Sequence, residues 1–197
     1  MKIMFASDIH GSAWGCKRLL DTFRSLGAER LVLLGDLLYH GPRNDLPKEY
    51  APKEVIAMLN QYKHVIYAVR GNCDTEVDQM VLEFPVMADY GLLVFGEQTF
   101  YATHGHVFGK DFLPPMQKGD ILIQGHTHLL MAEYMEAEGI GRIGILNPGS
   151  VSIPKGGNPA TYGLLKDGVF QIRSFEGDVV RSLSLETIDG MEEEKKG

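Results

Sequence analysis

The chain has 197 residues, of which 44% are hydrophobic and 23% charged, and its formal net charge is -7 at pH 7. These values are typical of a folded globular protein, so they exclude wholesale disorder and a collagen-like composition. The acidic balance argues against extensive nucleic-acid binding, which needs many lysine and arginine contacts to phosphates. A small phosphate-ester substrate stays open, because a pair of divalent cations can reverse the sign of the field inside one cleft.

The cysteines and the N-terminus indicate in which cellular compartment the protein is expected. Cys16 and Cys73 form no CxxC pair, which argues against a disulfide framework and against a zinc ribbon. The N-terminal MKIMFASD leaves no room for the charged and apolar regions of a signal peptide. No apolar stretch approaches the roughly 20 residues that span a bilayer. We therefore expect a cytoplasmic protein without a membrane segment.

The first half of the chain alternates buried-strand patterns with helical ones, which predicts a parallel α/β arrangement. Ser12 can cap the first helix and Gly27 can end it. Pro52 suits the first turn of the second helix, and Thr75 with Asp78 resembles a capping box for the third. The expected elements are strand 2–7, helix 12–26, strand 31–35, helix 51–62, strand 64–69 and helix 76–82.

From residue 92 the pattern changes to short strands separated by glycine-containing turns, which predicts a β-rich second half. Lys166-Asp167-Gly168 is typical of a hairpin turn. We expect a single domain over residues 1–188, and a disordered tail at 189–197, where the charged sequence has no apolar periodicity. The expected strands are 92–95, 98–103, 121–124, 132–137, 143–147, 161–166, 169–175 and 179–187.

Polar side chains follow the three predicted strands of the first half. Asp8 and His10 lie at i and i+2 after the first strand, so they share one face of an extended segment. Asp36 ends the second strand and Asn72 follows the third. Because ligands collect at the carboxyl ends of parallel strands, we expect these groups to meet there. Taken singly, each also has a structural interpretation as a cap or a turn residue.

Two pairs of histidines follow apolar strands in the second half. His104 and His106 form one i, i+2 pair, and His126 and His128 form the other. With His10, five of the seven histidines lie at predicted strand ends, whereas scattered loop histidines are the default expectation. His106 is open to two interpretations, because support of another ligand or contact with a substrate would serve as well as metal binding.

Carboxylates, an amide oxygen and imidazoles form a mixed ligand set that suits Mn²⁺, Fe or Zn²⁺ better than Ca²⁺. Seven ligands are too many for one zinc, but they suit two ions about 3.5–4 Å apart with a bridging carboxylate, for which Asp36 is the natural candidate. A single-metal oxygenase with a facial His/Asp set is the rival interpretation, but it leaves several histidines without a role. The candidate ligands are Asp8, His10, Asp36, Asn72, His104, His126 and His128.

The motifs D-x-H, G-D, G-N-[HC]-[DE], H-G and G-H-x-H occur here in that order between residue 3 and about residue 150. In this order the chain resembles the calcineurin-like metallophosphoesterase family, and GNCD at 71–74 with NPGSVS at 147–152 makes it similar to the YfcE-type phosphodiesterase branch. The resemblance implies an α/β fold, an αββα four-layer sandwich with two mixed β-sheets flanked by helices. It also implies one ion on Asp8, His10, Asp36 and His128, and a second on Asp36, Asn72, His104 and His126.

The resemblance further implies hydrolysis of phosphate esters by attack of a hydroxide that bridges two divalent metal ions, with Mn the first choice and Fe, Zn, Ni and Co the alternatives. One position departs from the family pattern, because Cys73 stands where a histidine usually follows the ligand asparagine. A thiol is a weaker source of positive charge for the leaving group, so phosphodiesters are expected ahead of phosphomonoesters. Cys73 also has other interpretations: a small filler between strand and helix comes first, followed by a metal ligand or a redox sensor.

Asn72, Cys73 and His106 are the candidate catalytic residues, and Cys73, Arg70 and His106 the candidate substrate contacts. Arg70 can instead be the partner of a surface ion pair. A phosphomonoesterase and a non-catalytic binding scaffold, as in the retromer subunit that resembles the same fold, are the alternative functions. A homo-oligomer is also left open, because members of the family often form dimers or larger assemblies.

Overall fold

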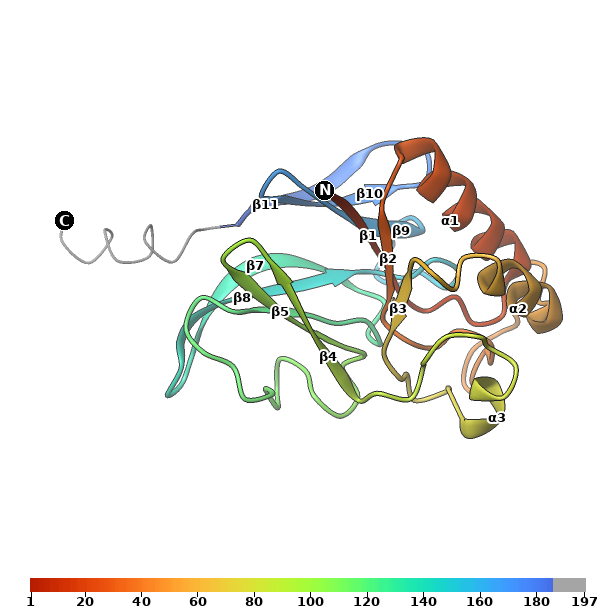
Figure 1. Cartoon of the computed structure of the whole chain (residues 1–197), viewed down its shortest axis with the longest axis horizontal. Helices are drawn as coiled ribbons and strands as arrows, with labels where there is room; N and C mark the ends of the chain where they lie inside the picture. Colours follow the sequence, from red (N-terminus) through yellow and green to blue (C-terminus); the bar gives the residue numbers. More distant parts are fainter. Residues whose placement is uncertain (186–197) are drawn as a thin grey trace.

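The computed structural model describes residues 1–185, which form two β-sheets packed face to face with helices on one side (Figure 1). The expected end of the domain at 188 and the expected disorder of 189–197 therefore lie outside the described residues. No helix in the described part of the chain is long and apolar enough to cross a membrane.

The first sheet has six strands in the order β11-β10-β9-β1-β2-β3. Its first three strands in sequence are parallel, because a crossover connection that includes a helix separates each from the next, whereas β9 pairs antiparallel with β1. The tight turn between β9 and β10 is the predicted hairpin, with positive φ at Asp167 (50°) and Gly168 (74°). The strands are β1 (Lys2–Ala6), β2 (Arg30–Leu33), β3 (Ile66–Ala68), β9 (Thr161–Lys166), β10 (Val169–Ser174) and β11 (Val179–Ser184).

The second sheet has five strands in the order β4-β5-β6-β8-β7. It is also mixed, since β5, β6 and β8 run parallel while β4 and β7 pair antiparallel at its edges. The strands are β4 (Tyr90–Phe95), β5 (Gln98–Thr103), β6 (Ile121–Ile123), β7 (Leu130–Ala137) and β8 (Gly141–Pro148).

The helices are α1 (Ala13–Leu26), α2 (Pro52–Asn60) and α3 (Glu76–Gln79). Ser12 caps α1 by accepting a hydrogen bond from the Gly15 amide, and Gly27 ends that helix in the left-handed conformation. The predicted capping box is present at α3, where Asp78 accepts from the Thr75 backbone and side chain. The last two helices are shorter than predicted and end at Asn60 and Gln79.

Alternation along β1 decides how the layers pack. Met4 and Ala6 face the helices, whereas Ile3 and Phe5 face the second sheet. The Phe5 ring stacks on Phe100 of β5 with centroids 6.2 Å apart, so this strand joins two hydrophobic layers. Complete burial of such a side chain contributes about 1.5–3 kcal/mol.

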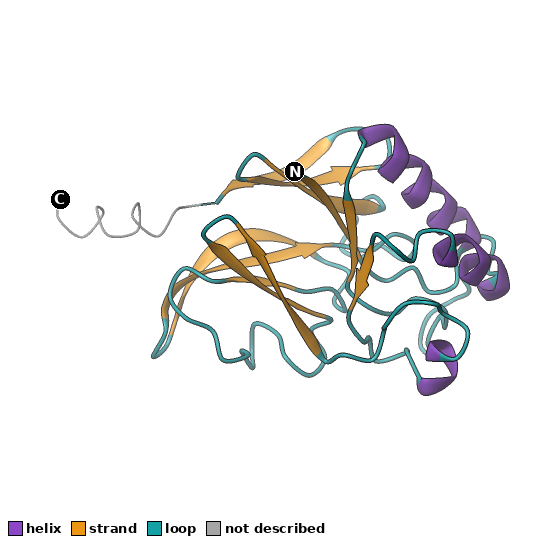
Figure 2. Cartoon of the chain, viewed as in Figure 1, coloured by secondary structure: helices purple, strands orange, loops and turns teal. Residues whose placement is uncertain are grey.

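The two outer layers differ. The two-sheet α/β sandwich is confirmed, but α1 and α2 both lie on the side of the first sheet, and the short α3 buries none of its residues (Figure 2). The outer face of the second sheet is covered by the segment between β5 and β6, where Leu113 and Met116 pack on Leu122 and the Tyr101 hydroxyl donates to the Pro115 carbonyl at 2.7 Å. A helix cannot form across this segment, because glycines and a Pro114-Pro115 pair interrupt it.

Candidate metal centre

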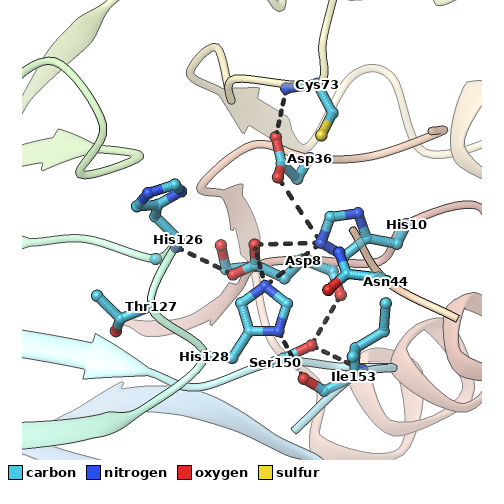
Figure 3. Close-up of polar contacts among 12 residues, drawn as sticks. Asp8, His10, Asp36, Asn44, Cys73, His126, Thr127, His128, Ser150 and Ile153 are labelled. Carbon is cyan, nitrogen blue, oxygen red and sulfur yellow. Dashed lines mark hydrogen bonds and ion pairs between the residues drawn. The ribbon is translucent and has the colours of Figure 1, made fainter. Parts of the chain in front are cut away.

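Five strand ends meet at one edge of the sandwich, and the predicted ligands lie on the loops that follow them. Asp8 and His10 follow β1, and the His128 loop follows β6 in the other sheet. The His128 Nε2 atom lies 3.2 Å from Asp8 Oδ1, and His10 Nε2 lies 3.6 Å from the same oxygen (Figure 3). His10 Nε2 is also 3.7 Å from Asp36 Oδ2, so Asp36 adjoins this group.

A second group lies on the other side of Asp36. His104 Nε2 is 3.5 Å from Asp36 Oδ2 and 3.1 Å from Asn72 Oδ1. The ring of His126 stands 5.0 Å, between centroids, from the ring of His104. Ligand atoms of Asp8, His10 and His128 thus lie within 4.8 Å of one another, and so do those of Asp8, Asp36 and His104.

Three of the histidines are held in one tautomer by main-chain carbonyls. A carbonyl oxygen can only accept a hydrogen bond, so the Nδ1 atom that faces it carries a proton, which leaves Nε2 as the ring atom that can bind a metal ion. The Nε2 atoms of His10 and His128 face each other at 3.4 Å. The three bonds run from His10 Nδ1 to Tyr39 O (2.8 Å), from His104 Nδ1 to Leu34 O (2.6 Å) and from His128 Nδ1 to Ile153 O (2.5 Å).

The electrostatics of the cluster call for a cation. Asp8 Oδ1 is fully buried and accepts no hydrogen bond from residues 1–185, although buried acceptors are nearly always paired. Burial alone would raise the pKa of Asp8, but His10 and His128 hold it well below its ordinary range. Burial would also lower the pKa of His104, yet Asp36 and Asp8 raise it to about 9. A proton or a metal ion satisfies these atoms, and the donor set fits divalent ions.

Backbone strain is concentrated at the same residues. Seven non-glycine residues in the described range have positive φ, and five of them are predicted ligands. Such conformations cost about 1–3 kcal/mol each and persist where the surrounding structure imposes them, commonly at functional sites. The five are Asp8 (59°), His10 (49°), Asp36 (55°), His126 (65°) and His128 (59°).

Two glycines of the motifs allow the loops to approach each other. A Cβ atom at Gly71 would overlap Asp36 Oδ1, and one at Gly125 would overlap Ser7 Oγ and come within 3.0 Å of Asp8 Oδ2. These positions therefore require glycine for space, and the G-N and G-H pairs of the sequence have a steric cause.

Two buried residues that the sequence analysis did not select support the centre. Asp74 accepts hydrogen bonds from the amides of Asp36 (2.8 Å), Leu37 (2.9 Å) and Gly71 (2.7 Å), so it ties the loops after β2 and β3 together. Asn147 donates to Gly125 O at 2.8 Å and to Thr127 Oγ1 at 3.1 Å, which braces the histidine loop after β6. Both lie inside motifs already visible in the sequence, GNCD and NPGSVS, but a motif does not reveal which neighbour a side chain supports.

The remaining predicted residues lie in three different settings. Cys73 lines the main cleft, its amide donates to Asp36 Oδ1 at 2.8 Å, and its Sγ accepts from Asn72 Nδ2 at 3.2 Å. Burial and nearby carboxylates raise the pKa of this thiol to about 12. His106 borders a neighbouring cavity, 5.3 Å between ring centroids from His104. Arg70 pairs with Asp89 at 2.6 Å.

The main cleft has a volume of about 480 Å³ and opens over the ligand cluster. Loops far apart in sequence form its wall, including residues 41–44 after β2 and Lys155 after β8. Neither loop has a residue spacing that identifies which of its side chains enter the cleft. Besides ligands and Cys73, the wall contains Gly41, Pro42, Arg43, Asn44, Thr127 and Lys155.

Two mixed sheets with clustered Asp, His and Asn side chains at their strand ends define a metal-dependent phosphoesterase, and the sequence comparison agrees. The chain belongs to the calcineurin-like phosphoesterase superfamily, whose domain it matches over residues 1–167. It is 52% identical over 172 residues to the phosphodiesterase YfcE of Escherichia coli strain K12, a match that covers 87% of this chain and 91% of that protein.

Two solved structures resemble this chain, one closely in sequence and fold and the other in fold alone. A structure of the phosphoesterase Yfce from E. coli matches with a TM-score of 0.90 and 48% identity, covering 94% of this chain and all of that one. Vps29 from Entamoeba histolytica matches with a TM-score of 0.53 and 23% identity, covering 87% of this chain and 90% of that one. The second match shows a shared fold alone.

Proposed function

We propose that the protein is a phosphodiesterase that hydrolyses a small phosphate diester with two divalent metal ions, Mn²⁺ first among the candidates. One ion would be held by Asp8, His10, Asp36 and His128, and the other by Asp36, Asn72, His104 and His126. The observation that carries the proposal is the buried cluster of imidazole Nε2 atoms beside Asp8 Oδ1, which accepts no hydrogen bond from residues 1–185, because a bound cation would satisfy these atoms together. Fe, Zn, Ni and Co suit the same ligand types.

Bound ions would supply charge stabilisation for the phosphate and a water of lowered pKa. The chain itself contributes rigidity, because main-chain carbonyls fix three imidazoles and Asp74 joins two of the ligand loops. The Asn72 amide donates to Cys73 Sγ at 3.2 Å, and its Oδ1 lies 3.1 Å from His104 Nε2. The role proposed for Cys73 is thus to position Asn72 and to line the cleft.

The preference for diesters rests on the lack of a positive charge at Cys73. With its pKa raised to about 12, the thiol is neutral near pH 7 and adds no cation beside the phosphate. A monoester brings an extra negative charge and, when its leaving group is an alkoxide, needs more help than a diester with a good leaving group. The printed name of the E. coli relative, a phosphodiesterase, supports the same choice. His106 is proposed as a contact to the leaving group, because it adjoins His104 and His126.

Compartment and assembly stay predictions. Both cysteines are buried and free, which supports a reducing compartment such as the cytoplasm. A homo-oligomer is checked by light scattering on the purified protein.

Asp36→Ala tests the proposed function most directly, because Asp36 is assigned to both ions. We expect wild-type protein to hold two ions per chain and to hydrolyse bis(4-nitrophenyl) phosphate, and the variant to lose both ions. Removing a residue that only hydrogen-bonds to a metal ligand lowers activity by up to about 10²-fold, so loss of a ligand itself should lower kcat/KM by more than this. Glu54→Ala, which removes an exposed carboxylate from α2, serves as the control. Full activity in Asp36→Ala, or one ion per wild-type chain, would contradict the assignment.

A further inference from the structure

A second cavity, of about 330 Å³, borders the main cleft, and His126 and Thr127 line both. The ligand cluster therefore sits beside two hollows that share part of their wall. A phosphate monoester has one substituent to place, whereas a diester has two that point away from a common phosphorus atom. Two hollows meeting at a proposed metal ligand match the shape of a diester.

The wall of the main cleft is cationic in a protein that is acidic overall. Arg43 and Lys155 lie on opposite loops, are both exposed, and form no ion pair within residues 1–185. Elsewhere on the surface many cations are paired, as in Arg70 with Asp89 and Lys63 with Glu83. Within residues 1–185, no carboxylate outside the ligand cluster lines this cleft, so the two charges are available to an anionic group of a bound molecule.

The wall of the second cavity has a different chemistry. Phe112 is 66% exposed and stacks on Phe108 with centroids 5.7 Å apart, and Val107 is 38% exposed. The charges on this wall, Lys110 and Asp111, lie 3.8 Å from each other and offset one another. What this cavity offers to a ligand is therefore mainly apolar and aromatic surface.

The loop that carries this apolar wall is braced. Gly109 and Phe112 exchange two main-chain hydrogen bonds, of 3.0 and 3.1 Å. The Lys110 amide donates to Gln124 Oε1 at 3.0 Å, and Gln124 is buried at the end of β6. The exposed Phe112 is thus presented by a closed loop anchored beside the metal centre.

We propose that the two cavities hold the two ester arms of one phosphodiester: an anionic arm against Arg43 and Lys155, and an apolar or aryl arm against Val107 and Phe112. The phosphate lies between them beside His126. This inference rests on the proposed function and adds a substrate class to it, namely an asymmetric diester with one charged and one apolar substituent. It also gives a steric reason for diester preference that is independent of Cys73.

The test uses three phosphodiesters that share a 4-nitrophenyl leaving group, with the second ester n-butyl, 3-carboxypropyl or 3-(trimethylammonio)propyl. Wild-type protein loaded with Mn²⁺ should prefer the carboxypropyl ester to the trimethylammoniopropyl ester in kcat/KM. The double variant Arg43→Gln/Lys155→Gln should lose about fivefold to tenfold of that preference, the scale of two partly exposed ion pairs, with the butyl ester little changed. Lys53→Gln, an exposed lysine of α2, is the matched control.

The second cavity is tested in the same assay with Phe112→Ser. This variant should raise KM for all three nitrophenyl esters by a similar factor, about tenfold, and leave the charge preference intact. Met80→Ser, at an 82% exposed position away from both cavities, is the control.

Three results would overturn the inference. The first is an equal loss of kcat/KM on all three esters in the double variant, which would place Arg43 and Lys155 on the phosphate. The second is an unchanged KM in Phe112→Ser, and the third is the absence of a charge preference in the wild-type protein. Each leaves the proposed function standing, because that function fails on a different result, the absence of Mn²⁺-dependent hydrolysis of the butyl ester by wild-type protein.

Discussion

The two groups of the candidate centre differ in how firmly the fold holds their members. In the group around Asp8, the carboxylate and both imidazoles are buried, and main-chain carbonyls hold His10 and His128. In the group around His104, the histidine itself is anchored, but Asn72 is exposed and His126 is half-buried. We therefore expect one half of the centre to be arranged in advance and the other half to close around an ion when it binds.

The largest effect is expected from comparing His128→Ala with His126→Ala. Both variants should lose diesterase activity at micromolar Mn²⁺, by more than about 10²-fold for His128→Ala, because each removes a proposed ligand. Millimolar Mn²⁺ should restore much of the activity of His126→Ala, since three ligands of that ion persist and this half tolerates adjustment. It should not restore His128→Ala, because the fixed half has no substitute ligand.

Steady-state kinetics across a Mn²⁺ titration, with calorimetric counting of bound ions, makes the measurement. His64→Ala, at an exposed position outside the centre, is the control. Equal rescue of both variants would abolish the proposed distinction between the halves.

A smaller effect is expected from Asn147→Ala, which loosens the loop that carries His126 and His128 without touching a ligand. The change leaves buried partners of three hydrogen bonds unpaired, which should cost about 1–3 kcal/mol in the free energy of unfolding. Activity at saturating Mn²⁺ should fall by about tenfold through misplaced imidazoles. Thermal unfolding and kinetics measure the two effects, with the exposed amide of Gln61→Ala as control. Unchanged activity together with lowered stability would show that the brace serves folding alone.

The smallest effect is expected from Cys73→His, which places an imidazole beside the second, less fixed group. A protonated imidazole can stabilise the leaving oxygen, so the ratio of monoesterase to diesterase kcat/KM should rise by about fivefold, below the usual range for an acid catalyst. Cys73→Ser keeps the size of the side chain and should leave the ratio unchanged. The assay compares 4-nitrophenyl phosphate with its bis-ester. An unchanged ratio in Cys73→His would show that Cys73 does not cause the preference for diesters.

The strand-end chemistry could be predicted from the sequence because it is local. A strand that ends in Asp8, Asp36 or His104 is visible as an apolar run followed by a ligand-type residue, and parallel strands bring such ends to one edge. The hairpin at Asp167-Gly168 and the caps at Ser12 and Gly27 are likewise set by neighbouring residues, and the structure confirms them. The two mixed sheets followed from the resemblance carried by the same motifs.

Features that depend on distant segments could not be read in this way. The carbonyls that fix the imidazoles belong to Leu34, Tyr39 and Ile153, and a carbonyl has no sequence signature. The loop that covers the second sheet in place of helices, and the meeting of Arg43 with Lys155 across one cleft, also depend on how the chain returns on itself.

Ligand type and strand pattern are short-range properties, so the amino-acid sequence indicates which side chains can bind metal and at which strand ends they lie. Packing of the folded chain sets which of these side chains are rigid, how Asp36 comes to adjoin both groups, and that two cavities of different chemistry meet at His126. Rigidity and cavity shape arise from packing and hydrogen bonds between residues far apart in the chain, so they exist only once the two sheets have closed on each other.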